Sequence, residues 1–207
     1  MKVKVCGITS YHDAAMALDL GVDALGFNFF PPSPRYIAPE EVRAIIRRLP
    51  PFTVSVGLFV NSEYGTVAEA VRVSGVQVIQ LHGDESPEYC EKLSGWPLIK
   101  VLRIGEAFSS GLVDGLEQYP VRAFLLDSRD DLLFGGTGKT FDWSISRRIR
   151  RVRPLILAGG LRPGNVGEAI RVVDPHAVDV CSGVESSPGR KDPILLREFM
   201  NEVRNAV

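Results

Sequence analysis

The chain has 207 residues, of which 45% are hydrophobic and 24% charged, and its formal net charge at pH 7 is -1. This composition is typical of a globular chain with a sizeable core, and the near-neutral charge gives no basic surface for nucleic acid or anionic membranes. The three cysteines, Cys6, Cys90 and Cys181, are too few and too widely spaced for a disulfide framework or a structural zinc site.

Apolar runs of strand length alternate with amphipathic runs of helix length along the whole chain. The expected strands are Val3–Ile8, Ala24–Phe30, Thr53–Val60, Val76–His82, Leu98–Ile104, Ala123–Asp127, Leu155–Gly159 and Ala177–Cys181. Strands at a mean spacing of about 25 residues predict a (β/α)8 barrel, an α/β fold. No linker divides the chain, so we expect a single compact TIM barrel domain over residues 1–207.

Helix-start signals stand between several of these strands. Ser10 or Asp13 can cap the first helix, Pro39-Glu40-Glu41 is typical of a first helical turn, and Ser86-Pro87 and Asp192-Pro193 each place proline behind a capping residue. An open doubly wound sheet would also alternate strands and helices. The first turn after a strand lacks the Gly-x-Gly-x-x-Gly motif of that fold, which favours the barrel.

The first strand leads to a thiol at its C-terminal end. Because strand side chains alternate, Lys4 and Cys6 share one face and Val3 and Val5 share the other. In a barrel covered by helices the valines face outward, so Lys4 and Cys6 are expected to face inward. A lone cysteine is commonly an inert buried side chain, and that interpretation stays open on spacing alone.

Two long loops are expected at the C-terminal rim, where barrel active sites are built. The loop Phe30–Ile37 contains three prolines and one cation, Arg35, whose guanidinium suits a carboxylate. The loop Ser128–Thr140 ends in Gly138-Lys139-Thr140, like a nucleotide-binding P-loop, but Leu133 stands where that motif needs glycine. We therefore expect a glycine-rich flap over a site, and no nucleotide triphosphatase.

Glycine turns follow the last two expected strands. Gly159-Gly160 ends the seventh strand and Ser182-Gly183 follows the eighth. Backbone N–H groups at such turns bind anions, and the loops after strands 7 and 8 are the recurrent phosphate site of this fold. The alternative is that these are only tight turns that need glycine. The pairing predicts a phosphorylated small-molecule substrate.

Asp127 ends the sixth expected strand and shares the inward face with Leu125. A carboxyl at the end of an apolar strand is costly to desolvate, so we expect it to carry a proton. It would face Cys6 across the barrel mouth, which is the arrangement of a general acid and a general base. A helix cap or a loop salt bridge is the alternative role for Asp127.

These segments together resemble the phosphoribosylanthranilate isomerase family. The matching segments are Lys4–Thr9, Phe30–Tyr36, Gln80–Gly83, Leu126–Ser128, Gly135–Gly138 with Phe141–Trp143, Leu157–Leu161, and Asp179–Glu185 with Gly189–Asp192. The resemblance implies a (β/α)8 barrel of tryptophan biosynthesis that needs no cofactor and no metal. The implied reaction is an Amadori rearrangement of N-(5'-phosphoribosyl)anthranilate to 1-(2-carboxyphenylamino)-1-deoxyribulose 5-phosphate.

The resemblance also implies roles for individual residues. Cys6 matches the general base, Asp127 the general acid, and Arg35 the residue that holds the anthranilate carboxylate. The implied phosphate-binding residues are Gly159, Gly160, Ser182 and Gly183, and the further substrate-binding residues are Gly136 and Asp179. Cys181 departs from the family pattern, and we expect it to face inward near Cys6, where the two thiols could crosslink on oxidation.

Three alternative functions share parts of this pattern. A histidine-pathway isomerase barrel is expected to have an aspartate near the end of the first strand, where this chain has Cys6. A metal-dependent epimerase needs several His and acidic ligands, and only His12, His82 and His176 are present. A barrel that binds a phosphorylated ligand without catalysis is the third alternative.

Several features are left open by the sequence. An ordinary thiol has a pKa of about 8.5, so Cys6 needs a neighbour that lowers it; Lys4 could do so, or could pair with Asp179 deep in the barrel. His82 is either a structural histidine or a rim group. A helix needs about 18 consecutive apolar residues to span a bilayer, and no apolar run approaches that length. No signal peptide is evident. We expect a cytoplasmic protein without nucleic-acid or membrane partners, either monomer or homodimer.

Overall fold

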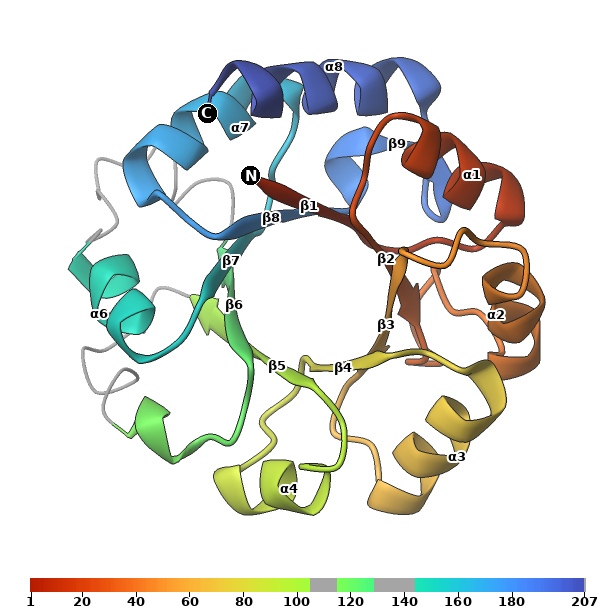
Figure 1. Ribbon diagram of the computed structural model, residues 1–207, viewed down its shortest axis with the longest axis vertical. Helices are drawn as coiled ribbons and strands as arrows, with labels where there is room; N and C mark the ends of the chain where they lie inside the picture. The colour runs from red at the N-terminus through yellow and green to blue at the C-terminus, as the bar shows by residue number, and fades with distance from the viewer. Residues whose placement is uncertain (105–114, 129–143, 207) are drawn as a thin grey trace.

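The computed structural model describes residues 1–104, 115–128 and 144–206 of the chain. Eight parallel strands close into a barrel in sequence order, β1 to β8. They are β1 (Lys2–Val5), β2 (Ala24–Asn28), β3 (Val54–Phe59), β4 (Val78–Leu81), β5 (Leu98–Ile104), β6 (Ala123–Ser128), β7 (Leu155–Ala158) and β8 (Ala177–Val180). Figure 1 looks down this ring of strands, which lies inside a ring of helices. The predicted barrel is confirmed.

The helices that start at Tyr11, Pro39, Pro87 and Pro193 begin at the predicted signals. The described α-helices are α1 (Tyr11–Asp19), α2 (Pro39–Ile46), α3 (Tyr64–Ser74), α4 (Pro87–Lys92), α6 (Ser144–Val152), α7 (Pro163–Val173) and α8 (Pro193–Asn205), with the short 3-10 helix η2 (Leu116–Gln118) between β5 and β6. Ser10, Ser86 and Asp192 each accept a hydrogen bond from a backbone N–H of the first turn. These caps satisfy N–H groups that have no partner within the helix.

All eight expected strands are present, although most are shorter than predicted. The first ends at Val5 and not at Ile8. Cys6 still donates its backbone N–H to the oxygen of Val180 (2.8 Å), but Gly7 adopts φ +75, which turns the chain out of the sheet. Cys6 therefore lies just beyond the strand, at the rim.

The core has two layers separated by the barrel wall. The larger layer joins strand residues such as Val3 and Val5 to the inner faces of the helices. The smaller layer consists of Val56, Ile99, Val101, Ala123, Leu125 and Ala158. Side-chain alternation assigns this smaller set to the barrel interior, as predicted for Leu125. The same alternation directs Lys4 inward, where it is buried.

A two-stranded antiparallel hairpin follows β8 and was not predicted. It comprises β9 (Glu185–Ser187) and β10 (Arg190–Lys191), after the 3-10 helix η3 (Ser182–Val184). Thr9 Oγ1 donates to the oxygen of Gly189 (2.6 Å), and the backbone N–H of Lys191 donates to Asp13 Oδ2 (3.1 Å). These bonds tie the hairpin to the segment that follows β1, so its side chains return to the barrel mouth.

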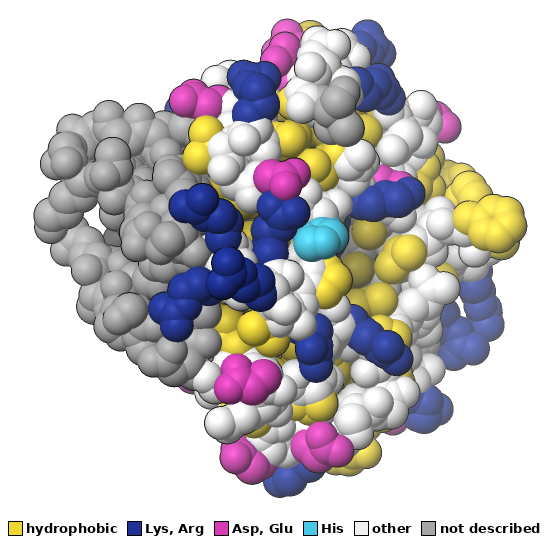
Figure 2. Space-filling model, turned by 60° about the vertical axis from the view of Figure 1, so that its left-hand side comes forward, with side chains coloured by type: hydrophobic (Ala, Val, Ile, Leu, Met, Phe, Trp, Pro, Cys, Tyr) yellow, Lys and Arg dark blue, Asp and Glu magenta, His cyan; other side chains and the backbone are white. Residues whose placement is uncertain are grey.

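Helix α6 is strongly basic, with the sequence SISRRIRRV. Ile149 is fully buried, whereas Arg147 and Arg151 are exposed and Arg150 pairs with Asp174 (2.5 Å). Figure 2 shows Lys and Arg side chains gathered on the side of the molecule that carries this helix. The polarity of the helix thus fixes which face packs on the barrel.

Within the described ranges, no helix is both long and apolar enough to cross a membrane.

Replacing a buried helix residue tests the outer core layer. Phe199→Ala in α8, where the side chain is fully buried, is expected to lower the free energy of unfolding by about 3–5 kcal/mol because it leaves a cavity. The matched control is Phe52→Ala, at a side chain that is 97% exposed, with an expected change within about 0.5 kcal/mol. Urea unfolding followed by circular dichroism measures the free energy of unfolding of both variants. Equal losses in Phe199→Ala and Phe52→Ala would contradict the assigned core.

Candidate active site

A cavity of about 490 Å³ lies at the mouth of the barrel, lined by residues at and beyond the C-terminal ends of β1–β4 and β6–β8. Seven residues predicted from the sequence line it: Cys6, Arg35, Asp127, Gly159, Gly160, Asp179 and Ser182. The structure therefore brings together side chains that are far apart in the chain. Gly136 and residues 129–140 of the predicted flap lie outside the described residues.

Lys4 and Asp179 form an ion pair inside the barrel. Lys4 Nζ lies 2.8 Å from Asp179 Oδ2, and both side chains are buried. Burial raises the pKa of Asp179 to about 7, although the Lys4 charge opposes that shift. Burial also lowers the pKa of Lys4, but the charges of Asp179 and Cys6 outweigh it and raise the pKa overall. The sequence left open whether Lys4 pairs with Asp179 or acts on Cys6, and it does both.

The Cys6 thiol is activated by its neighbours. A hydrogen bond from Cys181 is the largest cause that lowers the pKa of Cys6 well below its ordinary value. Burial opposes this shift, whereas the charges of Lys4 and Lys191 support it. The pKa of Cys181 is correspondingly raised, mainly by its interaction with Cys6, and the Cys181 thiol also donates to Glu185 Oε1 (3.9 Å). Both thiols are free, and Cys181 lies beside Cys6 as expected.

The Cys6 sulfur occupies space that is free because the neighbouring strand has a glycine at this position. A Cβ added at Gly26 of β2 would lie 2.8 Å from Cys6 Sγ and 3.1 Å from Lys4 Cε. Because real Cβ atoms do not approach so closely, the thiol could not keep this position beside any larger residue. Gly26 thus makes the room in which Lys4 and Cys6 lie one above the other.

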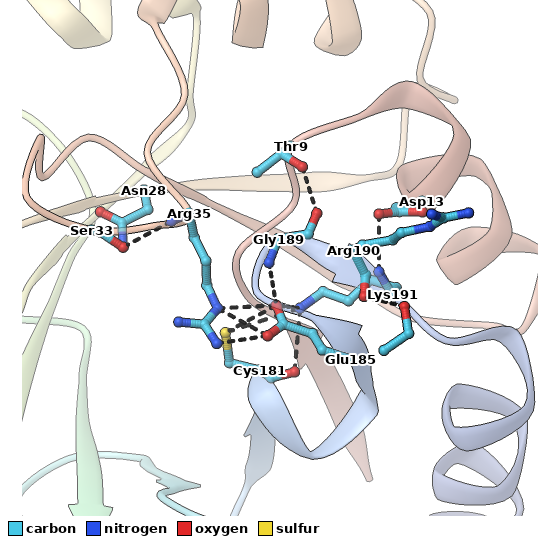
Figure 3. Close-up of polar contacts among 11 residues, drawn as sticks. Thr9, Asp13, Asn28, Ser33, Arg35, Cys181, Glu185, Gly189, Arg190 and Lys191 are labelled. Atoms are coloured by element: carbon cyan, nitrogen blue, oxygen red, sulfur yellow. Dashed lines mark hydrogen bonds and ion pairs between the residues drawn. The ribbon is translucent and has the colours of Figure 1, made fainter.

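Arg35 is held by a carboxylate that the sequence analysis did not single out. Figure 3 shows Glu185 between two cations. Arg35 Nε lies 3.0 and 3.1 Å from the two Glu185 oxygens and Nη2 lies 2.6 Å from Oε2, while Lys191 Nζ lies 2.8 Å from Oε1. Burial opposes ionisation, but these hydrogen bonds outweigh it and keep the pKa of Glu185 below its usual range. Arg35 Nη1 is not used by Glu185.

The loop that carries Arg35 is shaped by side chains from its own strand end. Asn28 Nδ2 donates to Ser33 Oγ (3.0 Å), and Asn28 Oδ1 accepts from the N–H of Phe30 (2.9 Å). The N–H of Arg35 donates to Ser33 Oγ (3.1 Å). These bonds add to the rigidity that three prolines give this loop, so the guanidinium is presented by a defined turn.

Asp127 lies across the cavity beside His82. His82 Nε2 is 3.0 Å from Asp127 Oδ2, and Gln80 Nε2 is 3.4 Å from His82 Nδ1. The Asp127 side chain is 32% exposed, so it is less enclosed than its place after an apolar strand suggested. The sequence left His82 as either structural or functional. The sequence feature that could have identified His82 as a site residue is its position at the end of β4, where an inward side chain reaches the rim.

The glycine turns lie against each other at one edge of the cavity. Gly159 and Gly160 both have positive φ, +86 and +56, which L side chains rarely adopt. Asn165 Nδ2 donates to the oxygen of Gly160 (2.9 Å) and holds this turn at the start of α7. A Cβ at Gly183 would lie 1.9 Å from the oxygen of Leu161, so only glycine lets the two loops approach.

Glu185 and Lys191 are the main residues of the site that sequence reasoning missed as individuals. They come from the hairpin after β8, and only their segments were noted. The sequence feature that could have identified them is the presence of a carboxylate and a cation shortly after the eighth expected strand. Among the residues described, no group of three or more His, Cys, Asp or Glu side chains is placed to hold a metal ion.

Comparison with known proteins gives consistent results. The family model described as N-(5'-phosphoribosyl)anthranilate (PRA) isomerase matches residues 3–202. An N-(5'-phosphoribosyl)anthranilate isomerase from Syntrophus aciditrophicus is 48% identical over 203 residues, which are 98% of this chain and 87% of that relative.

Two solved structures are similar over nearly their whole length. Phosphoribosyl anthranilate isomerase from Thermotoga maritima is 41% identical, with a TM-score of 0.86 and 99% of each chain covered. A phosphoribosyl anthranilate isomerase solved in complex with reduced 1-(o-carboxyphenylamino)-1-deoxyribulose 5-phosphate is 39% identical, with a TM-score of 0.85 and 99% of each chain covered.

The pH dependence of Cys6 alkylation tests the electrostatics of the thiol. Because its pKa is lowered, Cys6 is expected to react with iodoacetamide at neutral pH and to lose reactivity only as the pH falls through that lowered value. Cys181→Ala removes the hydrogen-bond donor and is expected to move the profile to higher pH, whereas Cys181→Ser keeps a donor and stays closer to wild type.

Peptide mapping by mass spectrometry assigns the modified cysteine. Cys90 is the internal control, since it is fully buried and burial raises its pKa to about 11. A Cys6 profile that Cys181→Ala leaves unchanged would show that Cys181 does not activate the thiol.

Proposed function

The chain belongs to the N-(5'-phosphoribosyl)anthranilate isomerase family, and from this premise we propose which of its residues perform the reaction. It is an isomerase of tryptophan biosynthesis that converts N-(5'-phosphoribosyl)anthranilate to 1-(2-carboxyphenylamino)-1-deoxyribulose 5-phosphate. The observation that carries the proposal is the activated thiol of Cys6 in the same cavity as the Asp127 carboxyl.

Asp127 acts first, as the general acid. Its carboxyl gives a proton to the ring oxygen of the ribose while the bond between that oxygen and C1 breaks. The lone pair of the anthranilate nitrogen forms the C=N bond, so the ring opens to a protonated Schiff base. Asp127 is left as a carboxylate beside His82 (3.0 Å).

Cys6 acts second, as the general base. Its thiolate removes the C2 proton, and the electrons of that bond neutralise the Schiff base to give an enolamine. The enolamine then tautomerises to the ketone. The lowered pKa of Cys6 supplies the thiolate at neutral pH, as this step needs. The chemistry uses side chains alone and requires no cofactor.

The charged ends of the substrate fit different edges of the cavity. The glycine turns at Gly159-Gly160 and Ser182-Gly183 take the phosphate, helped by the N-terminus of α7. Arg35 takes the anthranilate carboxylate through Nη1, the nitrogen that Glu185 does not use. Asp179 Oδ1 is buried without a hydrogen-bond partner, which suits a ribose hydroxyl. Gly136 remains a proposed contact on the resemblance alone.

The setting of the enzyme is also part of the proposal. Catalysis by a thiolate beside a second free thiol needs a reducing compartment, and the cytoplasm provides it. The substrate is a small molecule, and neither nucleic acid nor membrane takes part. Both a monomer and a homodimer are compatible with the site.

Exchange of each proposed catalytic side chain tests the two roles. Cys6→Ser and Asp127→Asn are each expected to lower kcat by at least about 10²-fold because each removes one proton-transfer group. Turnover of freshly made phosphoribosylanthranilate is followed by the loss of its fluorescence. Cys90→Ala and Asp19→Asn are the matched controls, at a core thiol and an exposed carboxylate. A variant that keeps wild-type kcat would remove that residue from the mechanism.

Substitution of Arg35 tests carboxylate binding. Arg35→Ala is expected to raise KM by about 10-fold or more, because charge-assisted hydrogen bonds contribute about 1.5–3 kcal/mol, and to change kcat less. Arg35→Lys keeps the charge without the forked geometry, so its KM is expected to lie between those of the wild type and Arg35→Ala. Arg72→Ala, at an exposed arginine in α3, serves as the control. An unchanged KM in Arg35→Ala would show that another group holds the carboxylate.

A further inference from the structure

We propose that His82 is a positioning residue for Asp127 and that Gln80 sets the tautomer in which His82 works. The inference rests on the proposed role of Asp127 as general acid. It concerns two cavity-lining residues that the mechanism above leaves without a task. Both lie at the end of β4, and because their positions differ by two they share one face of the strand.

The contacts form a short chain from the barrel interior to the acid. Gln80 is 1% exposed, and its Nε2 lies 3.4 Å from His82 Nδ1. His82 Nε2 in turn lies 3.0 Å from Asp127 Oδ2. The other amide atom, Gln80 Oε1, is buried and has no hydrogen-bond partner. Among the residues described, the imidazole of His82 is thus the hydrogen-bond partner that the structure gives to this buried amide.

The direction of these bonds follows from the chemistry of the groups. A carboxamide nitrogen can only donate, so His82 Nδ1 must accept. The proton of the neutral ring is then on Nε2, and it is donated to Asp127 Oδ2. Oδ2 is thereby occupied, which leaves Oδ1 as the oxygen that carries the acid proton toward the substrate.

This arrangement assists the proposed proton transfer without moving a proton of its own. When Oδ1 gives its proton to the ribose ring oxygen, the carboxyl becomes a carboxylate. The Nε2–H bond to Oδ2 then becomes charge-assisted and stronger. The stabilisation arises as the charge develops, so it acts on the transition state more than on the bound substrate.

The other charged groups near Asp127 do not take over this task. Arg103 is its register partner on β5, but its guanidinium is bound to Asp84. Asp179 on β8 is a carboxyl whose interaction with Asp127 is repulsive. Among the residues described, His82 is the hydrogen-bond donor that the structure places on the Asp127 carboxyl.

Nitrogen NMR of the wild-type enzyme tests the tautomer directly. With ¹⁵N-histidine label at neutral pH, the shifts of His82 are expected to show a proton on Nε2 and none on Nδ1. Gln80→Glu, of almost the same shape, puts an acceptor on Nδ1 and is expected to move the proton there and lower kcat. A proton on Nδ1 in the wild type would overturn the proposal, because the amide would then present its oxygen.

Kinetics of His82 variants test the consequence for catalysis. His82→Leu is expected to lower kcat by about 10- to 100-fold, the range for loss of a hydrogen bond to a charged group, with KM changed less than about threefold. His82→Gln can still donate an N–H to Asp127 and is expected to recover most of that loss. His176→Gln, at the opposite end of the barrel, where the ring contacts the N–H of Leu155, is the control.

The two possible failures can be told apart. If Asp127→Asn is inactive while His82→Leu keeps wild-type kcat, the positioning role is wrong and the general acid stands. If Asp127→Asn is active, the general acid is wrong and the positioning role falls with it. Loss of kcat in His82→Leu without recovery in His82→Gln would also overturn the proposal, since it would mark a packing role.

Discussion

Lys4 and Asp179 face each other where the first and last strands close the barrel, and the thiol of Cys6 lies close to Lys4 beside Gly26. Burying two charges is costly, and only close pairing offsets that cost. The lysine can therefore keep its charge in the interior because strand β8 supplies the carboxylate. The same charge acts on Cys6 and helps to lower its pKa. The Lys4–Asp179 pair thus joins the first and last strands, and its lysine also contributes to the lowered pKa of Cys6.

A second carboxylate organises the residues above the strands. Glu185 accepts hydrogen bonds from both Arg35 and Lys191, and it lies in the hairpin that binds back to the segment after β1. Two cations share one carboxylate, so this edge of the cavity keeps a positive excess beside Cys6 and Cys181. That excess favours both a thiolate and an anionic substrate, which links substrate binding to activation of the base.

The proposed base and acid occupy contrasting surroundings. Cys6 is buried, with two lysines acting on it, whereas Asp127 is partly exposed and is held by an imidazole. Cys6 follows β1 and Asp127 belongs to β6, so the strands of the barrel hold them at different positions around the same cavity. A base and an acid kept apart on fixed strands can act on the same substrate from different sides without exchanging their protons directly.

The sequence alone determined the barrel, the strand positions, the inward direction of Lys4 and Cys6, and the glycine turns, because alternation, caps and turn residues are local properties. It did not determine most of the contacts between side chains. His82 and Asp127 are 45 residues apart, and Arg35 and Glu185 are 150 apart. Their contacts exist only once the strands close in register and the hairpin returns to the rim. Hydrogen bonds and pKa shifts depend on those distances, and only the tertiary structure decided them.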